Sequence, residues 1–151
     1  IRHFPPGREI VAIDISEEML RRADSRRRNY SGQLQFVRAD ALKLCFADES
    51  FDTVTTSCTM CSVPDPQQAF REIHRVLRPG GKLLMFEHVR SRNPILGLTL
   101  DLMTLFTRRN GTEMNRRTVE TAIAVGFHIT NVETVFLDII LAVRGEKLSE
   151  N

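Results

Sequence analysis

The stretch that decides the fold is Ile10-Val11-Ala12-Ile13-Asp14-Ile15-Ser16-Glu17-Glu18. It opens with apolar, mostly β-branched residues, which are typical of a strand buried on both faces of a parallel sheet. The strand ends at the carboxylate of Asp14. Ser16 can then cap a helix, and Glu17 and Glu18 suit the positively polarised first turn of that helix. The stretch therefore predicts a buried strand that leads directly into a helix.

Further segments continue this alternation of strands and helices. Asp65 can cap a helix with Pro66 at its first position, and apolar residues recur at helical spacing as far as Leu77. Pro79-Gly80-Gly81 is predicted to end this helix. Strands are expected at 10–14, 34–37, 51–57, 82–87, 127–136 and 138–144, and helices at 16–29, 66–77, 96–107 and 116–125. The pattern predicts a single α/β domain over residues 1–151, with a mostly parallel sheet, helices on both faces and an antiparallel C-terminal strand.

The position of Asp14 carries a functional expectation. In nucleotide-binding α/β folds, an acidic residue at the end of such a strand accepts hydrogen bonds from ribose hydroxyls. A strand and a glycine-rich turn should precede it, but Gly7, Gly32 and Gly80-Gly81 do not supply that turn. We therefore expect the domain to be N-terminally incomplete, with its first strand and helix missing. The chain is then either a fragment of a longer protein or completes its sheet with another copy.

Composition limits the classes of function. Hydrophobic residues make up 42% and charged residues 26% of the chain, as in ordinary globular domains. The net charge of +2 is too small to indicate nucleic-acid binding. The apolar run Ile95 to Phe106 is too short for a membrane span and is interrupted by Asp101. Cysteines 45, 58 and 61 are an odd number, which favours free thiols, no metal site and a cytoplasmic location.

Four segments, in this order, carry a family resemblance: Val11–Leu20, Phe36–Ala41, Phe51–Val54 with Val63–Pro66, and Arg75–Leu83. They resemble the class I S-adenosylmethionine-dependent methyltransferases, which implies a Rossmann-like fold. Within that superfamily the chain is most similar to the quinone-biosynthesis, phospholipid and small-thiol methyltransferases. The resemblance implies S-adenosylmethionine as cofactor and transfer of its methyl group to a small or lipid-like acceptor. The glycine-rich motif of the family is lacking.

The resemblance also implies which residues bind the cofactor, all at the carboxyl ends of strands. Asp14 matches the residue that binds both ribose hydroxyls, because a carboxylate can accept two hydrogen bonds from a diol. Ile15 and Met19 match the apolar residues on either side of the adenine ring. The remaining matched residues are Asp40 and Ala41, beside the adenine amino group, and Ser57 and Cys58, beside the methionine part.

Each of these positions also has a purely structural interpretation. Asp14 could cap the helix that follows it, Met19 could belong to the core, and Asp40 could form a turn. Ser57 has no partner for a nucleophile's role visible in the sequence. Cys58 could simply be a small packing residue.

The acceptor side of the site is less specified. His88 follows the strand over 82–87 and is the candidate catalytic base, with an ordinary loop histidine as the alternative. The apolar run Ile95 to Phe106 could form a lid over an apolar acceptor, pack in the core, or contact a second copy. The apolar composition of this run is also compatible with a peripheral contact with a membrane. No nucleic-acid partner is expected.

Two other classes of function compete with methyl transfer. A chain without the glycine-rich turn could be a non-catalytic partner or regulatory domain that keeps the methyltransferase fold and has lost the cofactor. A nicotinamide-dependent oxidoreductase shares the fold and the acidic ribose residue, but Asp40-Ala41 and Pro79-Gly80-Gly81 speak against it.

Overall fold

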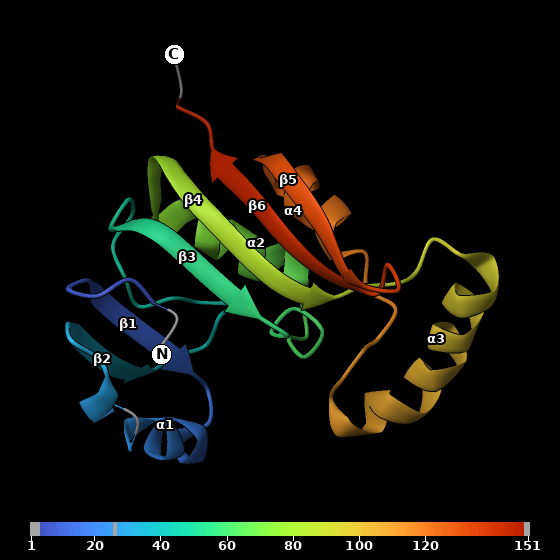
Figure 1. Cartoon of the computed structure of the whole chain (residues 1–151), viewed down its shortest axis with the longest axis horizontal. Helices are drawn as coiled ribbons and strands as arrows, with labels where there is room; N and C mark the ends of the chain where they lie inside the picture. Colours follow the sequence, from blue (N-terminus) through green and yellow to red (C-terminus); the bar gives the residue numbers. More distant parts are fainter. Residues whose placement is uncertain (1–3, 26, 150–151) are drawn as a thin grey trace. The chain divides into compact units, whose positions relative to one another are not determined.

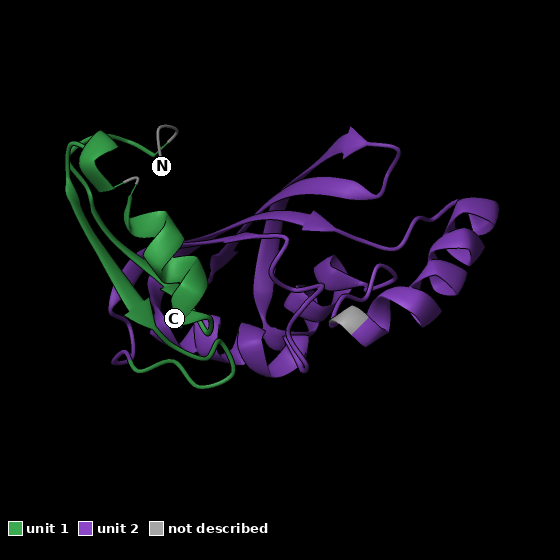
Figure 2. Cartoon of the chain, turned by 90° about the horizontal axis from the view of Figure 1, so that it is seen from below, with its two compact units in different colours: residues 1–45 green, residues 46–151 purple. Residues whose placement is uncertain are grey.

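In a computed structural model of the chain, residues 4–25 and 27–149 are described. The chain divides into two compact units, residues 1–45 and residues 46–151, shown in separate colours in Figure 2. Each unit is built around its own sheet with helices beside it. The α/β class that the sequence predicts is therefore confirmed.

Unit 1 is a pair of parallel strands with one helix. Strands β1 (Glu9–Asp14) and β2 (Gln33–Arg38) pair in parallel, with Asp14 opposite Arg38. Helix α1 (Glu17–Asp24) begins as predicted, because the Ser16 side chain accepts a hydrogen bond from the backbone amide of Met19. The helix ends before the predicted Asn29, and a short 3₁₀ turn, η1 (Arg27–Asn29), follows; Arg26 lies outside the described residues. None of the residues of α1 is buried, so the arginine-rich stretch has little apolar packing to extend the helix.

Unit 2 holds a sheet with the strand order β3-β4-β6-β5 (Figure 1). Its strands are β3 (Phe51–Ser57), β4 (Leu77–His88), β5 (Phe127–Phe136) and β6 (Ile140–Lys147). β3 and β4 are parallel, and β6 lies antiparallel between β4 and β5. The predicted antiparallel C-terminal strand is thus confirmed. β4 begins at Leu77 rather than after Gly81, because Leu77 already pairs with Phe51 before the register shifts.

Helices α2 (Pro66–Val76) and α4 (Thr118–Val125) pack against each other and cover one face of this sheet (Figure 1). The core of unit 2 lies between them and the strands, where Phe70, Leu83 and Met85 are buried. The opposite face leaves Phe86 exposed. The third helix of unit 2 does not lie on this sheet.

That third helix, α3 (Pro94–Thr107), extends beyond the end of β4 (Figure 1). Only Gly97, Leu100 and Thr104 are buried in it. Most of its large apolar side chains are exposed: Ile95, Leu98, Leu102, Met103, Leu105 and Phe106. The interpretation of this run as core is therefore wrong for these residues. None of the described helices is long and apolar enough to cross a membrane.

Candidate functional site

Asp14 lies at the carboxyl end of β1, where the sequence predicts ribose binding. Its Oδ1 accepts a hydrogen bond from the backbone amide of Ser16 at 2.8 Å, which forms a turn before α1, while Ser16 itself caps the helix. Within the described part of the chain, its other oxygen, Oδ2, has no hydrogen-bond partner. The turn therefore leaves one carboxylate oxygen of Asp14 available, and the ribose role of Asp14 stays a prediction.

Two exposed apolar side chains follow Asp14 in the chain. Ile15 follows it directly and is 64% exposed, and Met19 on the first turn of α1 is 52% exposed. Met19 therefore does not belong to the core of the described structure. An exposed apolar pair beside a free carboxylate oxygen fits a ligand with a flat aromatic part and a hydroxylated part, such as adenosine.

Asp40 and Ala41 follow β2 at the same end of the two-stranded sheet. The backbone amide of Ala39 donates to the carbonyl of Asp14 at 3.2 Å, which ties together the carboxyl ends of both strands. Asp40 Oδ1 accepts from the amide of Leu42 at 2.9 Å, so Asp40 forms the turn that its structural interpretation predicts. Unit 1 thus gathers Asp40 and Ala41 with Asp14 at one edge, while the adenine role of Asp40 stays a prediction.

Ser57 and Cys58 form the corresponding edge of unit 2. Cys58 has a φ of +48°, in the left-handed region that non-glycine residues rarely adopt, and its amide donates to the carbonyl of Phe86 at 2.8 Å. Burial, then Glu87 and Cys61, raise the pKa of the Cys58 thiol. The thiol is therefore protonated at neutral pH and is not an activated nucleophile.

The loop after Cys58 is held by a residue that sequence reasoning did not single out. Glu87 on β4 is 1% exposed, and its carboxylate accepts from the backbone amides of Thr59 at 3.1 Å and Met60 at 3.2 Å. Burial raises the pKa of Glu87, while the two amide hydrogen bonds oppose that shift. The signal was present in the sequence: Leu83, Met85 and Glu87 alternate along β4 and share its buried face.

His88, the candidate base, is the last residue of β4. Ser57 pairs with Phe86, so His88 and Cys58 lie at the same edge of the sheet. The imidazole is half-buried, and burial lowers the pKa of His88, which keeps it neutral at neutral pH. A hydrogen bond with the backbone of Met114 opposes that shift. The Nδ1 atom is buried and has no hydrogen-bond partner among the described residues. A neutral imidazole can accept a proton on the ring nitrogen that carries none.

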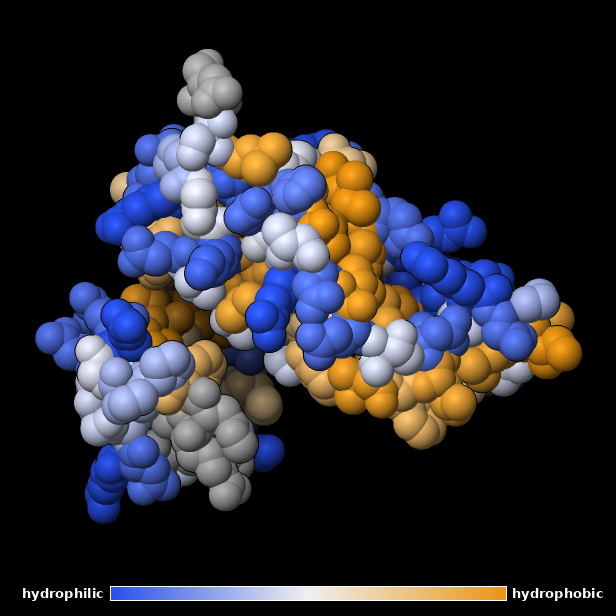
Figure 3. All heavy atoms as spheres, turned by 45° about the horizontal axis from the view of Figure 1, so that its top comes forward, coloured by the Kyte–Doolittle hydropathy of each residue, from blue (hydrophilic) through white to orange (hydrophobic). Residues whose placement is uncertain are grey.

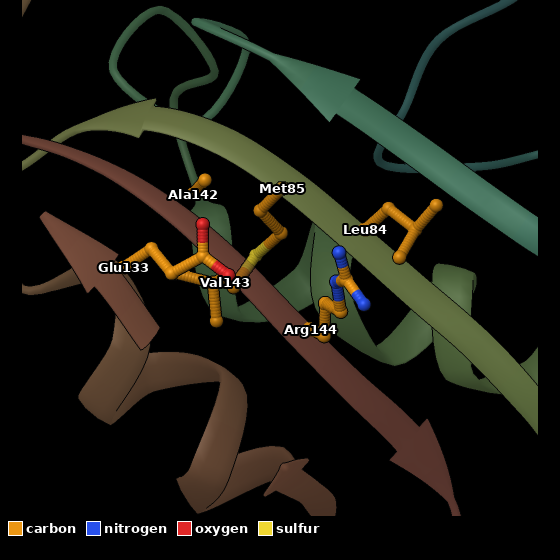
Figure 4. A pocket seen from close by; sticks show the side chains of 6 residues that line it. All are labelled: Leu84, Met85, Glu133, Ala142, Val143 and Arg144. Carbon is orange, nitrogen blue, oxygen red and sulfur yellow. The ribbon is translucent and has the colours of Figure 1, made fainter. Parts of the chain in front are cut away.

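A shallow hollow lies elsewhere on unit 2 and does not coincide with these residues. It has a volume of about 170 Å³ and is lined by residues of β4, β5 and β6, drawn as sticks in Figure 4: Leu84, Met85, Glu133, Ala142, Val143 and Arg144. It is smaller than the few hundred Å³ typical of cofactor sites and contains none of the predicted site residues. We do not assign it to the cofactor.

A Rossmann-like α/β architecture with an acidic residue at the end of its first visible strand defines a nucleotide-cofactor domain. The chain belongs to the methyltransferase domain family, whose model matches residues 2–85, and is a class I S-adenosylmethionine-dependent methyltransferase. S-adenosylmethionine is the cofactor of that family.

Two curated relatives share part of the sequence. The chain is 39% identical over 99 residues to the ubiquinone/menaquinone biosynthesis C-methyltransferase UbiE of Hahella chejuensis. This alignment covers 64% of the chain and 40% of the relative. It is 37% identical over 95 residues to the demethylmenaquinone methyltransferase of Lactobacillus johnsonii, covering 62% and 39%. The match thus spans about two fifths of the relatives' length.

Two solved structures share the fold. An S-adenosylmethionine-dependent methyltransferase from Methanosarcina mazei superposes with a TM-score of 0.73 at 24% identity, over 95% of this chain and 84% of that one. The cyclase SpnF superposes with a TM-score of 0.75 at 22% identity, over 94% of this chain and 67% of that one. These likenesses establish the fold, and the reaction has to be argued from the site.

Proposed function

We propose that the protein transfers a methyl group from S-adenosylmethionine to a small or lipid-like acceptor of the quinone type. The observation that carries this proposal is Asp14, with one carboxylate oxygen free beside the exposed Ile15 and Met19. The curated relatives support the acceptor class, because their names place them in ubiquinone and menaquinone biosynthesis.

Each residue has a defined part in this proposal. Asp14 binds the ribose diol, Ile15 and Met19 contact the adenine ring, and Asp40 with the backbone of Ala41 binds its amino group. Ser57 and Cys58 lie beside the methionine part. The cofactor supplies a methyl group that its sulfonium already activates, so the protein mainly aligns the acceptor. Neutral His88 takes the proton from a phenolic acceptor.

Calorimetric titration of the chain with S-adenosylhomocysteine tests the cofactor site. We expect micromolar binding that Asp14→Ala weakens at least about tenfold, since a charge-assisted pair of hydrogen bonds is lost. Glu9→Ala is the matched control, because Glu9 is an exposed carboxylate at the amino end of the same strand. Binding that survives Asp14→Ala unchanged would contradict the assignment of Asp14.

A non-catalytic methyltransferase-like partner is the alternative function. It predicts no binding of S-adenosylhomocysteine by the chain, alone or with an associated protein, and the same titration decides between the two functions.

We further propose that the protein is located in the cytoplasm. The support for this location is that Cys45, Cys58 and Cys61 are free thiols, which a reducing compartment preserves. Homodimer formation would appear as a doubled mass in sedimentation equilibrium.

A further inference from the structure

The apolar surface of α3 is unusually large for one helix. Ile95 is 79% and Phe106 is 76% exposed, and Leu98, Leu102, Met103 and Leu105 are exposed between them. Hydrophobic residues gather along the α3 end of unit 2 in Figure 3. Contiguous exposed apolar surface of this kind marks a site of interaction with a partner or a membrane.

A second apolar element lies beside the start of α3. The turn between β5 and β6 exposes Phe136 and Leu137. Asp138 of this turn accepts hydrogen bonds from the Ser91 hydroxyl at 2.6 Å and from the Arg92 amide at 2.8 Å. The turn is thereby held against the segment that leads into α3, and its apolar side chains extend the apolar surface.

The charge around this surface is strongly one-sided. Residues 89–117 contain six arginines and two carboxylates, and Asp138 of the turn adds a third carboxylate. This surface therefore carries a net charge of +3, whereas the whole chain carries +2. Two of the carboxylates are neutralised locally: Asp101 pairs with Arg90 at 2.8 Å and Glu113 with Arg116 at 3.1 Å. The exposed Arg108 and Arg109, at the end of α3, form no ion pair with any described residue, and the exposed Arg92, at its start, lies near Asp138 and helps to lower the pKa of that carboxyl.

We propose that α3, the β5–β6 turn and these three arginines bind the surface of an anionic lipid bilayer. An apolar helix lying in the interface buries its side chains among the acyl chains, while arginines at its ends meet anionic headgroups. Pairing with a second copy through α3 is disfavoured, because arginines would meet arginines at the helix ends. The proposal is independent of methyl transfer, since neither the arginines nor α3 belongs to the cofactor site.

Co-sedimentation with vesicles tests the proposal. We expect the chain to bind vesicles of phosphatidylglycerol and phosphatidylcholine in a 3:7 ratio, to bind pure phosphatidylcholine far more weakly, and to be released by salt. The double variant Leu98→Asn, Phe106→Asn should lower the bound fraction at least about tenfold. Arg108→Gln with Arg109→Gln should lower binding to the anionic vesicles about tenfold or more.

Matched controls distinguish binding through this surface from nonspecific adsorption to the vesicles. Ile123→Asn with Val132→Asn removes two exposed apolar residues elsewhere in unit 2, and Arg21→Gln with Arg22→Gln makes the same change of net charge on α1. Both controls should bind vesicles like the parent chain. The proposal is overturned if the chain does not bind anionic vesicles, if controls and test variants lose binding equally, or if the Leu98 and Phe106 changes instead dissolve a dimer.

Discussion

Glu87 on β4 accepts a hydrogen bond from the backbone amide of Thr59 across 28 residues of sequence. The bond connects the strand that carries His88 to the loop that carries Cys58. Because Glu87 is buried, this contact holds the loop from inside the protein. The positions of Cys58 and His88 in the candidate site therefore depend on the carboxylate of Glu87, which does not itself lie at the carboxyl edge of the sheet.

Replacing Glu87 with alanine should lower the free energy of unfolding by about 2–3 kcal/mol. The variant leaves the amides of Thr59 and Met60 without their acceptor in a buried place, and an unsatisfied buried donor costs about 1–3 kcal/mol. Urea unfolding followed by circular dichroism measures this change. A loss below about 0.5 kcal/mol would mean that water replaces the carboxylate without difficulty.

Glu87→Gln keeps the size of the side chain and removes its titratable carboxyl group, so it separates the effect of charge on stability from the effect of packing. Burial raises the pKa of Glu87 above that of an unfolded glutamate, so its contribution to stability is greatest below the unfolded pKa and falls as pH rises through the folded pKa. Stability measured from pH 4 to pH 8 should therefore decline less in the glutamine variant than in the parent chain. Identical pH profiles would show that Glu87 titrates like an exposed carboxylate.

His88→Gln should lower kcat for a phenolic acceptor about a hundredfold or more, because a positioned general base contributes at least that much. Burial lowers the pKa of His88, so the base stays neutral and the rate holds to more acidic pH than for a free histidine. The acidic limb of the pH–rate profile should disappear in the variant. His128→Gln, on the exposed surface of β5, is the control that should leave the profile unchanged.

Asp101→Ala should loosen α3 while the rest of unit 2 keeps its stability. The Asp101 carboxylate binds the Arg90 guanidinium and the Asn115 amide, and these contacts lower the pKa of Asp101. Its contribution is present above the usual carboxyl pKa and is lost as pH falls through the lowered value. Hydrogen exchange should accelerate in 98–105 and not in α2; uniform acceleration would indicate a global effect.

Asp65→Ala should cost about 1 kcal/mol of stability, because the Asp65 side chain accepts from the amide of Gln68 at the start of α2. Asp65→Asn keeps an acceptor and should cost much less. Thermal unfolding of the three proteins in parallel gives the comparison. Equal losses for both substitutions would show that charge, rather than capping, matters at this position.

Local chemistry made much of the fold predictable. The start of α2 follows from Asp65 and Pro66, and the end of α4 follows from Gly126, whose φ is +113°. These features depend on residues that are neighbours in sequence. The start of β4 could not be predicted in this way, because Leu77 joins the strand by pairing with the distant Phe51.

The candidate site was predictable to a similar extent. Strand ends located Asp14 at the carboxyl edge of the sheet of unit 1, and Ser57 and His88 at the carboxyl edge of the parallel pair in unit 2. Strand alternation also places Glu87 on the buried face, but its partner Thr59 is set by tertiary structure. The apolar composition of α3 predicted a helix, but its exposure could not be predicted, because core packing, a lid and contact with a second copy were all compatible with that composition.

The position of β6 also sets an order of events during synthesis. β6 follows β5 in the chain, yet it lies between β4 and β5, so these two strands cannot join one sheet until β6 arrives. On the ribosome, β4 therefore waits with its edge unpaired while α3, α4 and β5 are made. Non-local closure of this kind is slow and leaves apolar strand edges available to chaperones. The nascent chain should thus need protection until residues 140–147 have left the exit tunnel.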